Sequence, residues 1–131
     1  MKSLLRSLLA CVAALTLASV SPAADYQPKL GIQTWTLRNM NFDQVVEFAT
    51  KHQIKHLQMI GNHMDPHAPV AETRRKKAIL DQHGLVCYTF GVAGTSLDQA
   101  KNRQLFEFAK ELGIKLIVVE PGDFKILDLL E

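Results

Sequence analysis

The feature that most constrains this fold is a phrase that occurs three times. In each copy the end of an amphipathic helix leads through a small polar turn into a short apolar strand, and the copies occupy residues 48–60, 79–90 and 108–120. Repeats of roughly 30 residues are typical of βαβ units, whose right-handed crossovers give a parallel sheet. A further strand over residues 30–35 precedes the first copy. The sequence therefore predicts an α/β fold with four parallel strands and three helices.

The ends of the three helices carry recognisable signals. The first helix is predicted over 42–52 with Asn41 as its N-cap, and the second over 69–82. The third is predicted to begin at Ser96, in a capping box with Gln99, and to end at Gly113. The strands at 85–88 and 116–119 are continuous apolar runs, which predicts parallel strands covered on both faces.

Two α/β architectures compete for this pattern. A doubly wound nucleotide-binding fold needs a glycine-rich turn after its first strand, and the connection at 36–41 contains no glycine. This favours the first half of a (β/α)8 TIM barrel, about four βα units. A complete barrel needs about 250 residues. Residues 25–131 are therefore expected to form the N-terminal half of a barrel domain, patterned to pack against strands that it does not contain.

The N-terminus has the pattern of a secretory signal peptide over residues 1–24. Lys2 and Arg6 form a basic start, residues 8–20 are uncharged and largely apolar, and small residues follow, with cleavage expected after Ala23 or Ala24. The apolar run is shorter than the roughly 20 residues that span a bilayer, although a retained anchor is the alternative. The expected location is periplasmic or secreted, with no membrane contact after cleavage.

Charge and cysteine content narrow the classes of partner. The formal net charge of +2 falls to about zero once Lys2 and Arg6 leave with the signal peptide, and no basic surface for nucleic acid is expected. Cys87 is then the only cysteine left, so the exported domain is predicted to be held by its core alone.

Polar residues gather where the predicted strands end. Thr36 and Arg38 follow the first strand, Asn62 and His63 the second, and Glu120 closes the fourth. In α/β proteins the carboxyl ends of parallel strands form the edge where ligands bind. The sequence thus predicts a functional site at this edge.

Three segments together resemble a known family. Residues 30–38 resemble the opening strand of exported sugar phosphate isomerase/epimerase-type proteins, the xylose isomerase-like TIM barrels. Residues 61–63 resemble the Gly-His found after their second strand, and residues 105–121 resemble their third helix and fourth strand. The likeness covers nearly all of the chain after the signal peptide, although it depends on the combination of segments rather than on one motif.

The resemblance implies a metal-assisted rearrangement of a carbohydrate. In such enzymes a divalent ion (Mn, Mg, Co or Zn) stabilises an enediolate while a carboxylate moves a proton on carbon. The family draws its metal ligands from later strands, so the resemblance places them beyond Glu131. It also implies that this chain alone is inactive.

The resemblance also suggests roles for residues of the chain. Trp35 is predicted to stack on a sugar face, with Gln33 and Arg38 as further substrate-binding residues; a Trp packed under a helix is the alternative. His63 and Glu120 are the catalytic candidates, His63 as an auxiliary base and Glu120 as a carboxylate at the ligand-binding edge. An ordinary loop carboxylate is the alternative for Glu120.

Export and the lack of a glycine-rich phosphate loop predict an unphosphorylated sugar, keto-sugar or cyclitol as the small-molecule partner. Two other interpretations stay open. The chain could be a non-catalytic carbohydrate-binding or assembly protein on the same scaffold, because fold alone never settles function. It could also pair with itself as a homo-oligomer.

Overall fold

The computed structural model describes residues 28–129, so the predicted signal peptide at residues 1–24 lies outside the described residues. Along the chain the elements are β1 (Gly31–Gln33), the 3-10 helix η1 (Thr34–Leu37), α2 (Phe42–Lys51), β2 (His56–Met59), α3 (Val70–Gln82), β3 (Val86–Thr95), α4 (Gln99–Leu112), β4 (Ile117–Pro121) and the 3-10 helix η2 (Phe124–Leu129).

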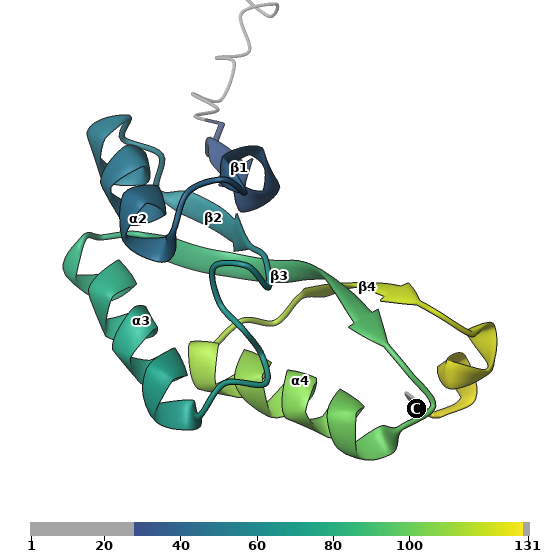
Figure 1. The fold of residues 1–131 in the computed structure, drawn as a ribbon. Helices are drawn as coiled ribbons and strands as arrows, with labels where there is room; N and C mark the ends of the chain where they lie inside the picture. Colours follow the sequence, from purple (N-terminus) through teal and green to yellow (C-terminus); the bar gives the residue numbers. More distant parts are fainter. Residues whose placement is uncertain (1–27, 130–131) are drawn as a thin grey trace, which may run out of the picture.

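The four strands form one parallel sheet in the order β1-β2-β3-β4 (Figure 1). Gln33 pairs with Gln58, and Gly94 of the long β3 pairs with Glu120. The register of β3 shifts against both of its neighbours. The predicted α/β class and parallel pairing are confirmed, and each crossover between neighbouring strands carries a helix, as parallel pairing requires.

The predicted half of a (β/α)8 barrel is wrong. The described residues form an open, uneven sheet with three α-helices, and its strands range from three residues in β1 to ten in β3. A 3-10 helix stands between β1 and α2, and β4 runs into a second 3-10 helix rather than completing a fourth βα unit. The error has a physical reason: helix–strand spacing identifies βαβ units, but every fold built from such units shares it.

The predicted helix ends agree with the structure more closely than the predicted strand ends do. Asn41 caps α2 in a capping box with Gln44, as its side chain and that of Gln44 exchange hydrogen bonds with the backbone. Gly113 ends α4 in the left-handed conformation, with φ of 73°. The predicted start of α4 is corrected: Asp98, not Ser96, is the N-cap and accepts from two backbone N–H groups.

The sheet has two unlike faces. The covered face packs against the helices and contributes Leu57, Met59 and Phe90 to the core, with Cys87 and Val119 partly buried beside them. The open face is formed by other residues of the same strands, whose side chains are exposed or half-buried: Gln33, His56, Gln58, Val86, Tyr88, Val92, Val118 and Glu120. The expectation that the strands are covered on both faces is therefore wrong for the described residues.

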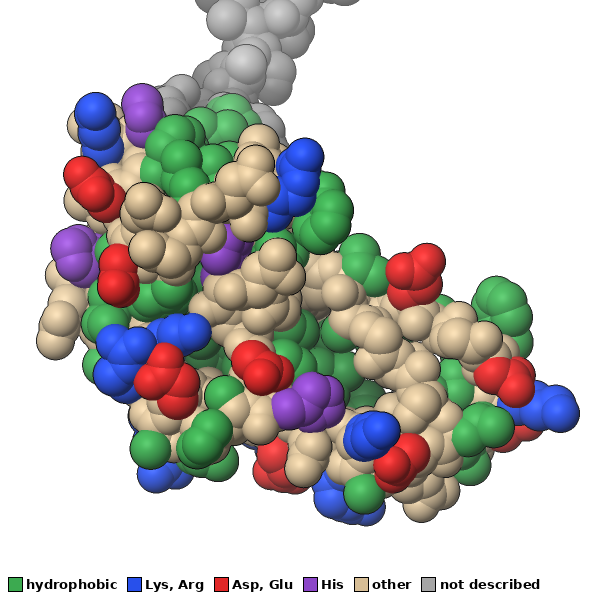
Figure 2. Space-filling model, in the orientation of Figure 1, with side chains coloured by type: hydrophobic (Ala, Val, Ile, Leu, Met, Phe, Trp, Pro, Cys, Tyr) green, Lys and Arg blue, Asp and Glu red, His purple; other side chains and the backbone are tan. Residues whose placement is uncertain are grey.

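The surface offers no charge patch on the face drawn in Figure 2, where basic and acidic side chains are interspersed. Residues 28–129 contain no helix that is both long and apolar enough to cross a bilayer.

Candidate functional site

A cleft of about 500 Å³ opens at the carboxyl ends of the strands, on the open face of the sheet. It brings together residues from β1, β3 and β4 and from the connections that follow β1 and β2: Gln33, Trp35, Ile60, Gly61, Asn62, Val92 and Glu120. Three of the five predicted site residues, Gln33, Trp35 and Glu120, thus line a single cavity although 87 positions of sequence separate the first from the last. The parallel pairing causes this, because it brings all four carboxyl ends to one edge.

Trp35 supplies the aromatic surface of the cleft. It lies in η1, the turn directly after β1, and 56% of it is exposed, so the alternative of a Trp packed under a helix does not hold. The guanidinium of Arg38 lies 5.4 Å from the centre of its ring, and Arg38 Nη1 donates to the Trp35 carbonyl oxygen at 3.2 Å. Arg38 does not line the cleft itself. It contacts Trp35, so its effect on a ligand would be exerted through the ring.

Polar side chains line the cleft together with this ring. Gln33 and Asn62 contribute amides that can both donate and accept, and Glu120 contributes a carboxylate that accepts. All three side chains are exposed to solvent. An apolar ring beside several hydrogen-bonding groups is a surface that suits a polyhydroxylated molecule with one apolar side.

His63 is placed differently from the other predicted site residues. It is 1% exposed and does not line the cleft. Its Nδ1 is 2.9 Å from Thr34 Oγ1, and its Nε2 is 3.1 Å from the carbonyl oxygen of Met40. Burial lowers the pKa of His63, the charge of Lys76 adds to this, and hydrogen bonds to backbone groups of Met40 and Leu37 oppose it. A ring with both nitrogens engaged is not presented to a ligand in the cleft.

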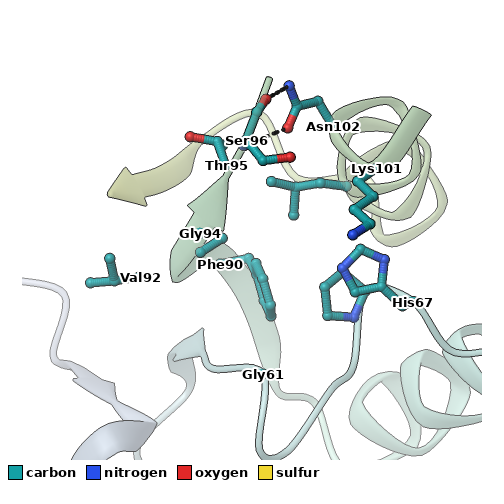
Figure 3. A pocket seen from close by; sticks show the side chains of 12 residues that line it. Gly61, His67, Phe90, Val92, Gly94, Thr95, Ser96, Lys101 and Asn102 are labelled. Atoms are coloured by element: carbon teal, nitrogen blue, oxygen red, sulfur yellow. Dashed lines mark hydrogen bonds between the residues drawn. The ribbon is translucent and has the colours of Figure 1, made fainter. Parts of the chain in front are cut away.

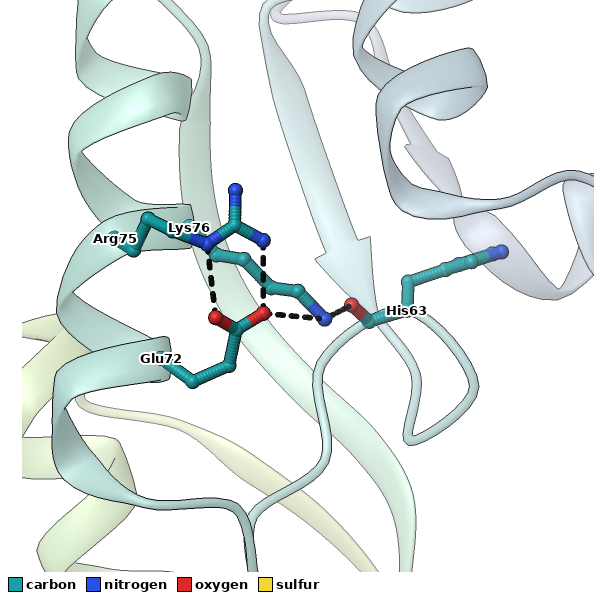
Figure 4. Close-up of polar contacts among 4 residues, drawn as sticks. All are labelled: His63, Glu72, Arg75 and Lys76. Atoms are coloured by element: carbon teal, nitrogen blue, oxygen red, sulfur yellow. Dashed lines mark hydrogen bonds and ion pairs between the residues drawn. The ribbon is translucent and has the colours of Figure 1, made fainter.

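The segment that carries His63 is fixed to α3 by a charged network (Figure 4). Lys76 Nζ donates to the His63 carbonyl oxygen at 2.8 Å and lies 3.6 Å from Glu72, which pairs with Arg75 through two hydrogen bonds. The hydrogen bonds from Arg75 lower the pKa of Glu72 to about 2. The network holds the start of the β2–α3 connection against α3, beside the cleft.

A smaller side pocket of about 310 Å³ adjoins the cleft and shares Gly61 and Val92 with it. Figure 3 shows the side chain of Lys101 from α4 extending toward His67, with Phe90 to one side of them. His67 Nδ1 is hydrogen-bonded to Gln104 Oε1 at 2.9 Å, and the Asn102 side chain donates a hydrogen bond to the Ser96 carbonyl oxygen at 2.7 Å. The walls of the side pocket are therefore tied to α4.

Metal-ligating side chains do not cluster in the described residues. Within 28–129 no group of three or more His, Cys, Asp or Glu side chains stands close enough to hold one. Glu120 is the lone carboxylate among the residues that line the cleft. The predicted ligands were placed beyond Glu131 and thus lie outside these residues.

Two residues that line the cleft were not predicted from the sequence. Ile60 and Val92 form apolar parts of the cleft wall. Val92 was missed because the third strand was predicted from the apolar run at 85–88, whereas β3 runs on to Thr95. Gln58 Nε2 donates to the Gly91 carbonyl oxygen at 3.0 Å across this region. The small residues at 91–95 gave no strand signal that periodicity could detect.

The comparisons with known proteins concern the fold and show no family. No protein-family model matches the chain, and no curated protein matches it either. The class that the structure defines is an α/β protein with a four-stranded parallel sheet.

Among solved structures, the chain is similar to an uncharacterised protein from Parabacteroides distasonis ATCC 8503, with a TM-score of 0.67 and 20% sequence identity. The match covers 76% of this chain and 45% of the other, so the chain spans less than half the length of that structure. At this identity the likeness concerns the fold alone.

Proposed function

We propose that the chain binds a small, unphosphorylated carbohydrate (a sugar, keto-sugar or cyclitol) in the cleft at the carboxyl ends of its strands. The observation that supports this is the half-exposed Trp35 ring in a cavity whose other polar members are Gln33, Asn62 and Glu120. The apolar side of a sugar ring packs on an aromatic face, and its hydroxyls can bond to amides and a carboxylate.

Trp35 is the single tryptophan of the chain, so its emission reports binding directly. We expect free sugars or cyclitols to change this emission in a saturable manner, with calorimetry giving the affinity. Trp35→Ala should weaken the binding about tenfold or more, a loss of about 1.4 kcal/mol. Phe124→Ala is the matched control, since Phe124 is an exposed aromatic side chain that does not line the cleft. Binding of sugar phosphates alone would contradict the proposal.

A second candidate function is favoured by Glu120. A carboxylate beside a bound sugar can take a proton from carbon, the step that isomerases and epimerases share. We propose that the chain supplies the sugar-binding part of such an enzyme, exported from the cytoplasm, whose metal-dependent chemistry would need residues outside 28–129. Taken alone, the chain should bind sugar without converting it.

A deuterium-exchange experiment distinguishes the two candidate functions. The bound sugar is incubated in D₂O with Mn²⁺ and analysed by NMR for exchange at carbon. No exchange with this chain, and exchange with a longer protein that contains it, is the result expected for the isomerase or epimerase. In that longer protein, Glu120→Gln should abolish exchange while binding remains. Binding without exchange in both proteins would leave the carbohydrate-binding function alone.

A further inference from the structure

His63 connects the two ends of the segment that carries the aromatic part of the cleft. Thr34 begins η1 and Met40 lies just before α2, and the ring of His63 reaches both, at 2.9 Å and 3.1 Å. Trp35 and Arg38 lie between these two contacts. We call the arrangement of His63, Thr34 and Met40 the histidine bridge. It fixes the position of the Trp35 segment relative to the β2–α3 connection, which contributes Gly61 and Asn62 to the cleft.

The partners of the ring determine which of its two nitrogens carries the hydrogen in the neutral form. A carbonyl oxygen only accepts, so His63 Nε2 must carry a hydrogen and donate to Met40. In the neutral ring Nδ1 then has no hydrogen and accepts from the Thr34 hydroxyl. Both contacts of the histidine bridge are satisfied when the imidazole is neutral.

Protonation would disturb this arrangement. A charged ring carries hydrogens on both nitrogens, so Nδ1 would have to donate to Thr34 Oγ1 and the hydroxyl hydrogen would lose its acceptor. Thr34 is fully buried, and among the described residues its hydroxyl has no other hydrogen-bond partner. A buried donor without an acceptor is unfavourable, and so is a charged imidazole that is 1% exposed.

The surrounding charges favour the neutral ring. Lys76 of α3 is the cation next to His63. Glu72 and Arg75 of the same helix form an ion pair with each other, and Glu72 also contacts Lys76. From α2, Asp43 acts on Arg75. The Thr34–Met40 segment contributes backbone groups of Leu37 and Met40, and their hydrogen bonds oppose the effects of burial and of Lys76 on the pKa of His63. No carboxylate of these elements is bonded to the His63 ring itself.

We propose that neutral His63 is the positioning residue that holds Trp35 in the cleft, and that protonation of His63 releases the Thr34–Met40 segment and weakens ligand binding. The part that concerns a ligand rests on the proposed function, whereas the part that concerns Trp35 does not. Because the bridged state binds the proton less readily than the released state, the bridge is complete above about pH 6.5 and weakens as pH falls. Linkage limits the change to about tenfold per pH unit.

The test follows the emission anisotropy of Trp35, the only tryptophan, from neutral pH into acid. We expect one transition below pH 6.5 in which anisotropy falls while the far-UV circular dichroism stays constant. His63→Gln should abolish the transition, because glutamine can occupy the bridge but does not titrate in this range. His67→Gln is the matched control and should keep it, since His67 lies four residues further along the same connection, outside the bridge.

Several outcomes would overturn the proposal. They are the lack of a transition in the unchanged chain, a transition that persists in His63→Gln, and a coincident loss of circular dichroism, which would indicate global unfolding. If His63→Gln does not fold, NMR of the unchanged chain decides: the His63 ring, assigned through its contacts to Thr34, must titrate together with the change in Trp35.

The ligand part is tested with the sugar that binds best at neutral pH. Its affinity should fall along the same pH transition in the unchanged chain and stay constant in His63→Gln. A transition in Trp35 without binding of any sugar would disprove the proposed function and leave the positioning role standing. Binding of a sugar that is independent of pH would overturn the part of the proposal that concerns the ligand and leave the proposed function standing.

Discussion

The covered face and the open face of the sheet are made by different residues of the same strands, and they differ in composition and in what they contribute. On β3 the covered face holds Cys87 and Phe90, whereas the open face shows Val86, Tyr88 and Val92 to solvent. The covered face is apolar and continuous with the helices. The open face mixes apolar and polar side chains and leads into the cleft at its carboxyl end. The covered face therefore accounts for stability, and the open face carries the ligand contacts that we propose.

The largest expected effect is the loss of a core aromatic ring. Phe90 is 1% exposed and packs edge-to-face on Phe108, with ring centres 4.8 Å apart. Phe90→Ala should lower the free energy of unfolding by about 3–5 kcal/mol in urea titrations followed by circular dichroism. Tyr88→Ala, on the open face of the same strand and 44% exposed, should cost less than about 1 kcal/mol. Equal losses would contradict the distinction between the two faces.

The next effect concerns two glycines of β3. Gly91 has φ of 131°, and a Cβ there would overlap the carbonyl oxygen of Val118 on β4. Gly91→Ala should therefore cost about 2–4 kcal/mol through backbone strain and overpacking. A Cβ at Gly94 would meet nothing within 4 Å, so Gly94→Ala should change stability by no more than about 0.5 kcal/mol. The same urea titrations measure both, and a neutral Gly91→Ala would show that β3 and β4 can separate without cost.

The sequence anticipated what depends on local chemistry. Asn41 could be assigned as a cap from its position before an amphipathic stretch, and Gly113 as the end of a helix from the known preference for glycine there. The parallel sheet followed from the repeat of helix and strand. The gathering of Gln33, Trp35 and Glu120 at one cavity followed in turn from parallel pairing.

What the sequence did not reveal depends on tertiary contacts. The length of β3 is set by its pairing with β4, where Gly94 and Thr95 face Glu120 and Pro121, and no periodicity records this. The place of His63 was also beyond prediction. A histidine after a strand looks the same in sequence whether it turns toward a ligand or, as here, toward Thr34 and Met40. Closure of the sheet was predicted wrongly because spacing describes the unit and not its number or curvature.

A third prediction uses the one cysteine in the described residues, which belongs to the covered face. Burial raises the pKa of the Cys87 thiol from 9.0 to about 11. The thiolate fraction near neutral pH is then about a hundredfold lower than in the unfolded chain. In a Cys11→Ser background, a thiol reagent such as DTNB should react about a hundredfold more slowly in buffer than in concentrated urea. Comparable rates would show that the covered face opens readily.

The smallest effect is expected at the outer surface of α3, where Glu72 pairs with Arg75 and Lys76. The pKa of Glu72 is lowered from 4.5 to about 2, mainly by hydrogen bonds from Arg75, so the folded state binds this proton less readily than the unfolded state. The contribution of Glu72 is thus complete above about pH 4.5 and disappears as pH falls toward about 2. Solvent and salt screen such exposed pairs, which keeps the effect small.

The measurement is the difference in thermal midpoint between the unchanged chain and Glu72→Gln as a function of pH. The difference should be positive at neutral pH, shrink below about pH 4.5 and fall further in high salt. Glu107→Gln is the control, because it removes an exposed ion pair with Lys110 on α4. It distinguishes the effect of losing any ion pair from the effect of losing the network beside His63. If Glu72→Gln destabilised the chain as much as Phe90→Ala, the surface of α3 would contribute as much to the free energy of unfolding as the covered face. The stability of the fold could then not be assigned to its core.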